Sequence, residues 1–442
     1  MGLCCPAFAC TPPAPATNQM AILTPCSPTL VSANQVTAGT LGNVSMAAAD
    51  FMVNPSASQT VQVHAPGMVN VEVWTHGAMA ARLTNNGMDT FTGTINTSLE
   101  NNGPVHTRIL AWNSAPGNNN FTVHLWASFD FYIRTNGSNL YTPPMPTAAA
   151  GMTLKWKEAF NSPTYVLSAT PCKPGTGIWP NCTPPTASDG FTWFENKTQS
   201  CTPGTRCGVD FGNAAWEHTD GPYNPFAIFQ GGTTQASGGY LRTRLTYDPN
   251  YVDPYGFHRN WRTGGLSTAF PDGSYSTPTF AEGYYEARIL LPDGATSDGS
   301  VPNSGGTFPA FWMLTTQGIL ASSSNVEEDI MEANGPFPYD YAATQHVYGS
   351  ATGPNSTIYH GIPGPDLTWG FHRFGLLVTA TMVSAYYDDQ LMGSVAKGLM
   401  PGNVDPIWFV MIDAANGSGW PINPPPAGYF DMWVNYVSYY AP

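Results

Sequence analysis

Residues 325–335 read Asn-Val-Glu-Glu-Asp-Ile-Met-Glu-Ala-Asn-Gly, with four acidic residues in six consecutive positions of a chain that is only 10% charged. Side chains alternate between the two faces of a regular strand, so Glu327 and Asp329 share one face while Glu328 and Glu332 share the other. One extra residue after Asp329, a β-bulge, moves Glu332 to the face of Glu327 and Asp329. The stretch therefore predicts a bulged strand that carries three carboxylates in a row.

A row of carboxylates suits the cleavage of a glycosidic bond. In retaining hydrolysis one carboxylate attacks the anomeric carbon and a second, protonated one donates to the leaving oxygen, about 5 to 5.5 Å away. Like charges this close raise one another's pKa, which keeps a proton within the group. The middle residue, Asp329, can then accept a hydrogen bond and orient the nucleophile. Two plainer explanations of the same cluster are a calcium site and an exposed acidic strand.

The surrounding stretches make the chain resemble glycoside hydrolase family 16. Its signature E-x-D-x-x-E is matched by Glu327, Asp329 and Glu332. The similarity covers about residues 190–442. Stretches that resemble the family's strands in order are WRTGGLST (261–268), EGYYEARILLP (282–292), FPAFWML (308–314), QHVY (345–348), WGFHRF (369–374), AYYDD (385–389) and NGSGWP (416–421).

The resemblance implies a role for each carboxylate. Glu327 is expected to be the nucleophile, Asp329 its assistant, and Glu332 the general acid/base. At the position after the nucleophile the family usually has an apolar residue. Here it is Glu328, which is expected to face away from the site and to pair with an arginine.

The resemblance also implies substrate-binding residues. Trp312 is expected to form an aromatic floor near the cleaved sugar, and His346 to be a polar neighbour of the acid. Trp420 and Asn416 are expected to contact sugars on the donor side. Each tryptophan has the alternative of being a core aromatic, and His346 of being a hydrogen-bonded core or rim histidine. A long insertion, Asp293 to Thr307, is expected to shape one wall of the cleft.

Period-two alternation predicts an all-β protein. Runs such as Val69-Asn-Val-Glu-Val-Trp74 and Gly283-Tyr-Tyr-Glu-Ala-Arg-Ile-Leu-Leu291 alternate or carry β-branched and aromatic residues, and turn signals separate them. The expected fold is a β-jelly-roll sandwich preceded by a smaller antiparallel β-sandwich. The expected divisions are a Pro- and Cys-rich extension (1–35), an accessory sandwich that is a candidate for carbohydrate binding (36–140), a Pro-rich joint (141–189) and the jelly roll (190–442).

Charge narrows the range of partners. The net charge is −14 and no basic run occurs, whereas binding to nucleic acid or to an anionic membrane requires clustered Lys and Arg. The sequence therefore predicts neither of these partners, and a neutral polysaccharide as substrate. Hydrolysis by two glutamates requires no cofactor. A structural calcium ion is compatible with so acidic a sandwich, but the sequence indicates no ligand set and no oligomeric state.

The cysteines point to an oxidising compartment. All eight lie in two Pro- or Gly-rich groups, Cys4, Cys5, Cys10 and Cys26, then Cys172, Cys182, Cys201 and Cys207. Neither group contains the two closely spaced pairs that are typical of a zinc site, so disulfides are favoured and a secreted protein is expected. No stretch has the length and apolar character of a transmembrane helix.

These features together predict a secreted, retaining endo-glycosidase that acts on β-1,3- or mixed-linkage β-glucan. A galactan hydrolase of the agarase or carrageenase kind is an alternative that the low basic content disfavours. A transglycosylase uses the same two glutamates and differs only in the acceptor. A protein of another class, a non-catalytic glycan-binding or structural protein on the same fold, is also an alternative, because fold does not imply activity.

Overall fold

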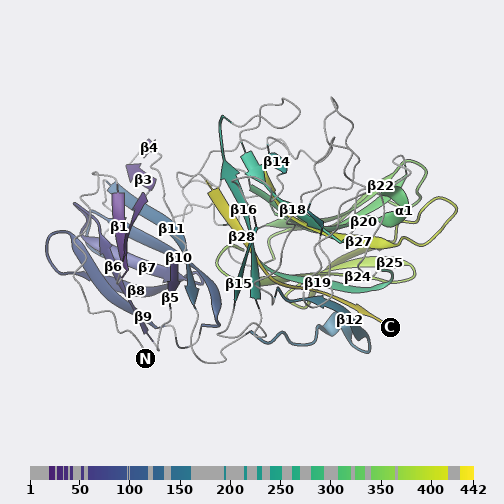
Figure 1. Cartoon of the computed structure of the whole chain (residues 1–442), viewed down its shortest axis with the longest axis horizontal. Coiled ribbons are helices and arrows are strands. Elements are labelled where there is room, and N and C mark those ends of the chain that lie inside the picture. The colour runs from purple at the N-terminus through teal and green to yellow at the C-terminus, as the bar shows by residue number, and fades with distance from the viewer. Residues whose placement is uncertain are drawn as a thin grey trace. The chain divides into compact units, whose positions relative to one another are not determined.

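A computed structural model gives the fold of the chain (Figure 1). It describes residues 19–24, 27–32, 34–37, 40–42, 51–53, 58–96, 98, 100–117, 123–133, 141–160, 194–195, 214–216, 226–230, 239–250, 261–268, 280–292, 307–319, 324–333, 340–363, 367–416 and 429–442. The chain forms two compact units: one spans Met1–Tyr141 with two short later segments, and the other contains the remainder.

The first unit consists of strands. They are β1 (Gln19–Thr24), β2 (Ser27–Ser32), β3 (Asn34–Thr37), β4 (Thr40–Gly42), β5 (Phe51–Val53), β6 (Ser58–His64), β7 (Asn70–Thr75), β8 (Ala78–Asn85), β9 (Thr90–Asn96), β10 (Gly103–Trp112) and β11 (Val123–Ile133). Among the described residues they form one sheet in the order β2-β1-β6-β9-β8-β7-β10-β11-β3-β4, with β5 beside β11.

This sheet folds over its own core at β8. The first part of β8 pairs with β7, and its last residues, Thr84 and Asn85, pair with β9. Apolar residues of β6 and β9 thereby pack against those of β7 and β10, and Val63, Val73 and Ile109 are fully buried. The alternation seen in the sequence supplies this core, because every second residue of each strand points inward.

The second unit contains the glutamate-rich strand. Its elements are η1 (Thr147–Ala149), β12 (Thr153–Glu158), β13 (Phe194–Glu195), β14 (Ala214–Trp216), β15 (Phe226–Gln230), β16 (Gly239–Tyr247), β17 (Trp261–Thr263), β18 (Gly265–Ser267), β19 (Gly283–Leu290), β20 (Thr307–Thr315), α1 (Thr316–Ile319), β21 (Asn325–Ala333), β22 (Tyr341–Tyr348), β23 (Ser356–Gly361), β24 (His372–Val378), β25 (Met382–Tyr387), β26 (Gln390–Ala396), β27 (Trp408–Asn416) and β28 (Tyr429–Ala441).

Two sheets make a sandwich in this unit. In the described part of the chain, one has seven strands in the order β13-β18-β27-β20-β21-β22-β23. The other has ten: β14-β17-β16-β28-β19-β24-β25-β26, with β12 beside β28 and β15 beside β16. A single apolar core joins residues of both sheets, for example Met313 of β20 and Leu376 of β24. Within this unit, Figure 1 shows β20, β22 and β27 in one layer and β19 and β24 in the other.

The all-β prediction is confirmed, since α1, of four residues, is the one α-helix among the described residues. Some strands lie in segments for which the sequence analysis predicts no strand. β12 falls within the predicted joint, yet it pairs with β28 and buries Trp156 in the sandwich core. β1, within the predicted N-terminal extension, pairs with β6. No described helix is long and apolar enough to cross a membrane.

Candidate active site

Strand β21 carries the β-bulge that its sequence predicts. On the β22 side, Asp329 lies opposite Thr344 and Glu332 opposite Ala342, so Ile330 and Met331 together span the single residue Ala343. The register to β20 shifts at the same place. Ile330 and Met331 both point into the main core, and Glu332 is thereby returned to the face that carries Glu327 and Asp329.

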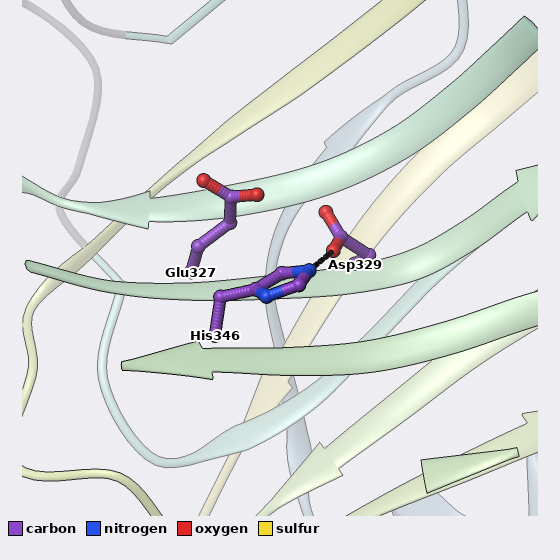
Figure 2. Close-up of side chains that lie close together, drawn as sticks. All are labelled: Glu327, Asp329 and His346. Carbon is purple, nitrogen blue, oxygen red and sulfur yellow. Dashed lines mark ion pairs between the residues drawn. The ribbon is translucent and has the colours of Figure 1, made fainter. Parts of the chain in front are cut away.

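The three carboxylates lie on the face of the seven-stranded sheet that points away from the main core. Asp329 is only 3% exposed, whereas Glu327 and Glu332 are partly exposed. Glu327 and Asp329 therefore differ in their access to solvent although they lie on one strand. Figure 2 shows both beside the ring of His346.

Burial dominates the electrostatics of this row. It raises the pKa of Glu327 to about 8, with a further rise from the charge of Asp329. The pKa of Asp329 is raised well above its usual value, first by burial and then by the charges of Glu332 and Asp413. Burial also raises the pKa of Glu332. The row therefore retains protons at neutral pH, as an acid/base site requires.

His346 supplies the opposing charge. It lies directly opposite Glu327 on β22, and its Nε2 is 3.2 Å from Oδ2 of Asp329, the contact drawn in Figure 2. Its charge lowers the pKa of Glu327 and of Glu332, against the effect of burial. His346 is thus a polar neighbour of the whole row, where the sequence analysis expected a neighbour of the acid.

Trp312 lies beside the row on β20. Its Cα is paired with that of Asp329, and its side chain is 5% exposed in a small apolar cluster on the outer face of the sheet. The indole Nε1 donates a 2.7 Å hydrogen bond to Oδ2 of Asp413 on β27. This bond fixes the ring next to the carboxylates, and the role of Trp312 as an aromatic floor stays a prediction.

Glu328 departs from one expectation. It faces away from the row and is fully buried, between Val326 and Ile330 of the main core. The predicted pairing with an arginine is wrong, because neither carboxylate oxygen has a hydrogen-bond partner among the described residues. Its cross-strand neighbour Gln345 has its amide occupied: Nε2 donates to two backbone carbonyls and Oε1 accepts from the backbone N–H of Gly398.

The remaining predicted residues are only partly described. Asn416 ends β27, with its Cα paired to that of Thr307, and its side chain lies outside the described residues, as does Trp420. The interior of the predicted insertion, residues 293–306, and all eight cysteines also lie outside them. The roles assigned to Asn416 and Trp420 therefore stay predictions.

One group of side chains has the donors for a metal ion. Ligand atoms of Glu327, Asp329 and His346 all lie within 4.8 Å of one another, the one such group among the described residues. Two carboxylates with an imidazole suit a transition metal better than calcium, which prefers oxygen ligands. A cation there would occupy Glu327, from which the sequence analysis expects the nucleophile.

Two neighbours of the row were missed by sequence reasoning. Tyr348, at the end of β22, stacks its ring on that of His346, and the charge of Asp413 on β27 raises the pKa of Asp329. The sequence carries a weak signal for the first, since Tyr348 is two residues from His346 and shares its strand face. It carries none for Asp413, which is 101 residues from its partner Trp312.

Comparison with known proteins finds no matching family model. Two curated relatives are similar to the chain, both named endo-1,3-1,4-beta-glycanase and both from Rhizobium meliloti (strain 1021). EglC is 30% identical over 257 residues, 58% of this chain and 44% of EglC. ExsH is 27% identical over 180 residues, 40% of this chain and 33% of ExsH. The chain thus spans less than half the length of either relative.

Solved structures similar to the chain include the laminarinase catalytic domain from Thermotoga maritima MSB8, at 21% identity and a TM-score of 0.44, over 66% of this chain and 98% of that one. Another is the endo-beta-1,3-glucanase from Pyrococcus furiosus, also at 21% identity, with a TM-score of 0.43, over 66% and 94%. The relationship to the two curated proteins shows that the chain contains an endo-β-glycanase-like domain, of the kind that its resemblance to glycoside hydrolase family 16 predicts.

Proposed function

We propose that the chain is a retaining endo-glycosidase that hydrolyses β-1,3- or mixed-linkage β-glucan. The observation that carries this proposal is the bulge in β21, which brings Glu327, Asp329 and Glu332 onto one face of the sheet. The names of the curated relatives support the substrate class, because both are endo-1,3-1,4-β-glycanases.

The first step forms a glycosyl-enzyme intermediate. An oxygen of ionised Glu327 bonds to the anomeric carbon, while the bond to the leaving oxygen breaks and that oxygen takes the proton of Glu332. Asp329 is buried between them along the strand, and its charge influences how the protons are shared among the three carboxyl groups. The raised pKa of Glu332 supports its role as the acid of this step.

The second step returns the enzyme to its starting state. Glu332, now ionised, accepts a proton from water as the water oxygen attacks the anomeric carbon, and the bond to Glu327 breaks. When His346 is protonated, its charge favours the ionised form of both glutamates.

The decisive experiment is product release by the full chain from laminarin, lichenan, agarose and carrageenan. New reducing ends from laminarin or lichenan, with an early fall in polymer size, are expected for endo-cleavage of a glucan. Release from agarose or carrageenan alone would replace the substrate class with a galactan. Products longer than the substrate would indicate a transglycosylase. No release from any of the four polymers would favour the non-catalytic alternative.

The compartment, the metal and the accessory unit are parts of the same proposal. Secretion is supported by the even number of cysteines in compact groups, and mass spectrometry without reductant is expected to find Cys172, Cys182, Cys201 and Cys207 bridged among themselves. Four free thiols there would contradict it. A structural calcium ion is proposed on acidity alone, and a rise in melting temperature on adding calcium is the test. Glycan binding by the first unit is tested by pull-down on insoluble glucan.

A further inference from the structure

The carboxylates of Glu327 and Asp329 and the imidazole of His346 form a group with the donors of a metal site. Each residue offers one ligand atom, and these atoms lie within 4.8 Å of one another. Glu327 and Asp329 share one face of β21, and His346 lies directly opposite Glu327 on β22. Figure 2 shows the three side chains together at these strands. Backbone pairing of two adjacent strands therefore gathers the donors before any ligand binds, which lowers the cost of binding.

Two of the donors have the spacing of neighbouring ligands. Nε2 of His346 and Oδ2 of Asp329 are 3.2 Å apart. Around a tetrahedral ion with bonds of about 2.0 Å, adjacent ligand atoms are about 3.3 Å apart. The third donor belongs to Glu327, whose side chain is partly exposed and can change rotamer to bring an oxygen to the same ion.

Asp329 contributes an oxygen that has no hydrogen bond. The residue is 3% exposed, and its Oδ2 has no hydrogen-bond partner among the described residues, although Nε2 of His346 lies near it. In the described part of the chain, His346 is also the one basic side chain that contacts an oxygen of the row. A buried carboxylate without a partner is costly, and coordination of a metal ion is one way to satisfy it.

The donor set selects a class of ion. Imidazole suits zinc, copper and nickel, whereas calcium takes six to eight oxygen ligands. Three protein ligands also leave a position of a tetrahedral zinc ion to water. An ion has access to the group, because the side chain of His346 is 38% exposed and that of Glu327 is partly exposed.

We propose that Glu327, Asp329 and His346 form an inhibitory site for a divalent transition-metal ion of the zinc class. An ion bound there engages the carboxylate of Glu327, which then cannot bond to the anomeric carbon. The inhibition rests on the proposed function, in which Glu327 attacks the sugar. The binding of the ion does not, since it requires only the three donors.

The first test is isothermal titration of the untagged full chain with zinc chloride. His346→Gln and Glu327→Gln each remove one ligand of the proposed site. Because changes in the outer shell of a metal site already cost about 10- to 100-fold in affinity, each variant is expected to bind this one equivalent of zinc at least about 100-fold more weakly. Zinc bound equally by the unsubstituted chain and both folded variants, at the cysteines or at other histidines, overturns the proposal.

His360→Gln is the matched control. His360 lies on the next strand, β23, and its Nε2 is 3.5 Å from Oδ2 of Asp340. This pair resembles the contact of His346 with Asp329 but is not part of a described group of three donors. The control is expected to bind zinc like the unsubstituted chain. Loss of the same equivalent in His360→Gln would place the ion elsewhere and overturn the proposal.

Kinetics test the inhibition separately. Zinc is expected to lower the rate of reducing-end release from β-glucan, with half-inhibition near the calorimetric Kd and full recovery on adding EDTA. The residual rate of His346→Gln is expected to be insensitive to the same zinc concentration. Zinc bound at the site with an unchanged cleavage rate overturns the inhibition. If the unsubstituted chain cleaves no glycan without zinc, the proposed function fails, while the calorimetry still decides whether the metal site exists.

Discussion

The two faces of strand β21 hold the same functional group in different surroundings. On the outer face, Glu327 lies opposite His346 on the next strand, and Asp329 lies 3.2 Å from its Nε2. On the inner face, Glu328 lies fully buried with no hydrogen-bond partner among the described residues. In both places burial raises the pKa of the carboxyl groups. What separates them is the presence of groups that stabilise the charged form, and only the outer face has these.

A buried acid without such groups stays neutral and carries a cost. The pKa of Glu328 is raised well above its usual value, first by burial and then by the charges of Asp329 and Glu327. An ionised carboxylate in that position would lack any compensating partner, so the protonated form is the one compatible with the fold. The comparison therefore teaches that a strongly shifted pKa identifies a functional residue only when partners for the ion are also present.

The largest expected effect comes from replacing one carboxyl group on each face. Glu327→Gln keeps the shape of the side chain but removes the attacking oxygen anion, so kcat is expected to fall by about 10⁴-fold or more while glucan still binds. Glu328→Gln makes the same chemical change one residue away, and activity at neutral pH is expected to stay within about threefold. Equal losses in the two variants, measured by reducing-end release, would refute the assignment of the faces.

The second effect separates the two outer glutamates. Glu332→Ala is expected to lose most activity on glucan, about 10² to 10⁴-fold, because the leaving group is no longer protonated. An activated aryl β-glycoside needs little protonation and still forms the intermediate, and added azide is expected to restore turnover with a β-configured glycosyl azide. In Glu327→Ala, which vacates the place of the attacking carboxylate, azide attacks from that face and gives the α product. The same anomer from both variants, seen by NMR, would show that the two roles are wrongly assigned.

The third effect concerns stability and belongs to the inner face. The pKa of Glu328 is higher in the folded chain than the value of about 4.3 in the unfolded chain. Between those two values the folded state holds one more proton, so this group lowers the free energy of unfolding by about 1.4 kcal/mol for each unit of rising pH. Glu328→Met removes this loss. Its stability advantage in urea unfolding is expected to be larger at pH 8 than at pH 5, and an advantage independent of pH would contradict the neutral buried acid.

The smallest effect compares two tryptophans on opposite faces of the same sheet. Trp312→Phe deletes the donor to Asp413 and is expected to cost about 1 to 3 kcal/mol of unfolding free energy, together with about tenfold in kcat/KM. Trp408→Phe is the control, because Trp408 is fully buried in the main core and its Nε1 has no hydrogen-bond partner among the described residues. It is expected to lower stability with little change in kcat/KM. Similar kinetic losses in both would show that Trp312 acts through packing alone.

The sequence by itself was sufficient for the all-β class and for the bulge at Asp329. Both are local properties: alternation has a period of two along one strand, and four acids in six positions make the register shift evident once three of them have to share a face. The order of motifs around Glu327, and hence the endo-β-glycanase-like domain, could also be recognised, because motif spacing is a property of the linear chain.

Only the tertiary structure decided which groups surround those carboxylates. Trp312 and Asp413 are hydrogen-bonded although 101 residues separate them in the sequence. Strands β12 and β28 pair although they lie near the start and the end of the second unit's sequence. No local pattern reports that Glu328 lies opposite Gln345, whose amide is already occupied, or that the charge of Asp413 raises the pKa of Asp329. Strand pairing brings together residues that are far apart in sequence, and the pKa of a carboxyl group depends on those neighbours and on burial, which exist only in the folded chain.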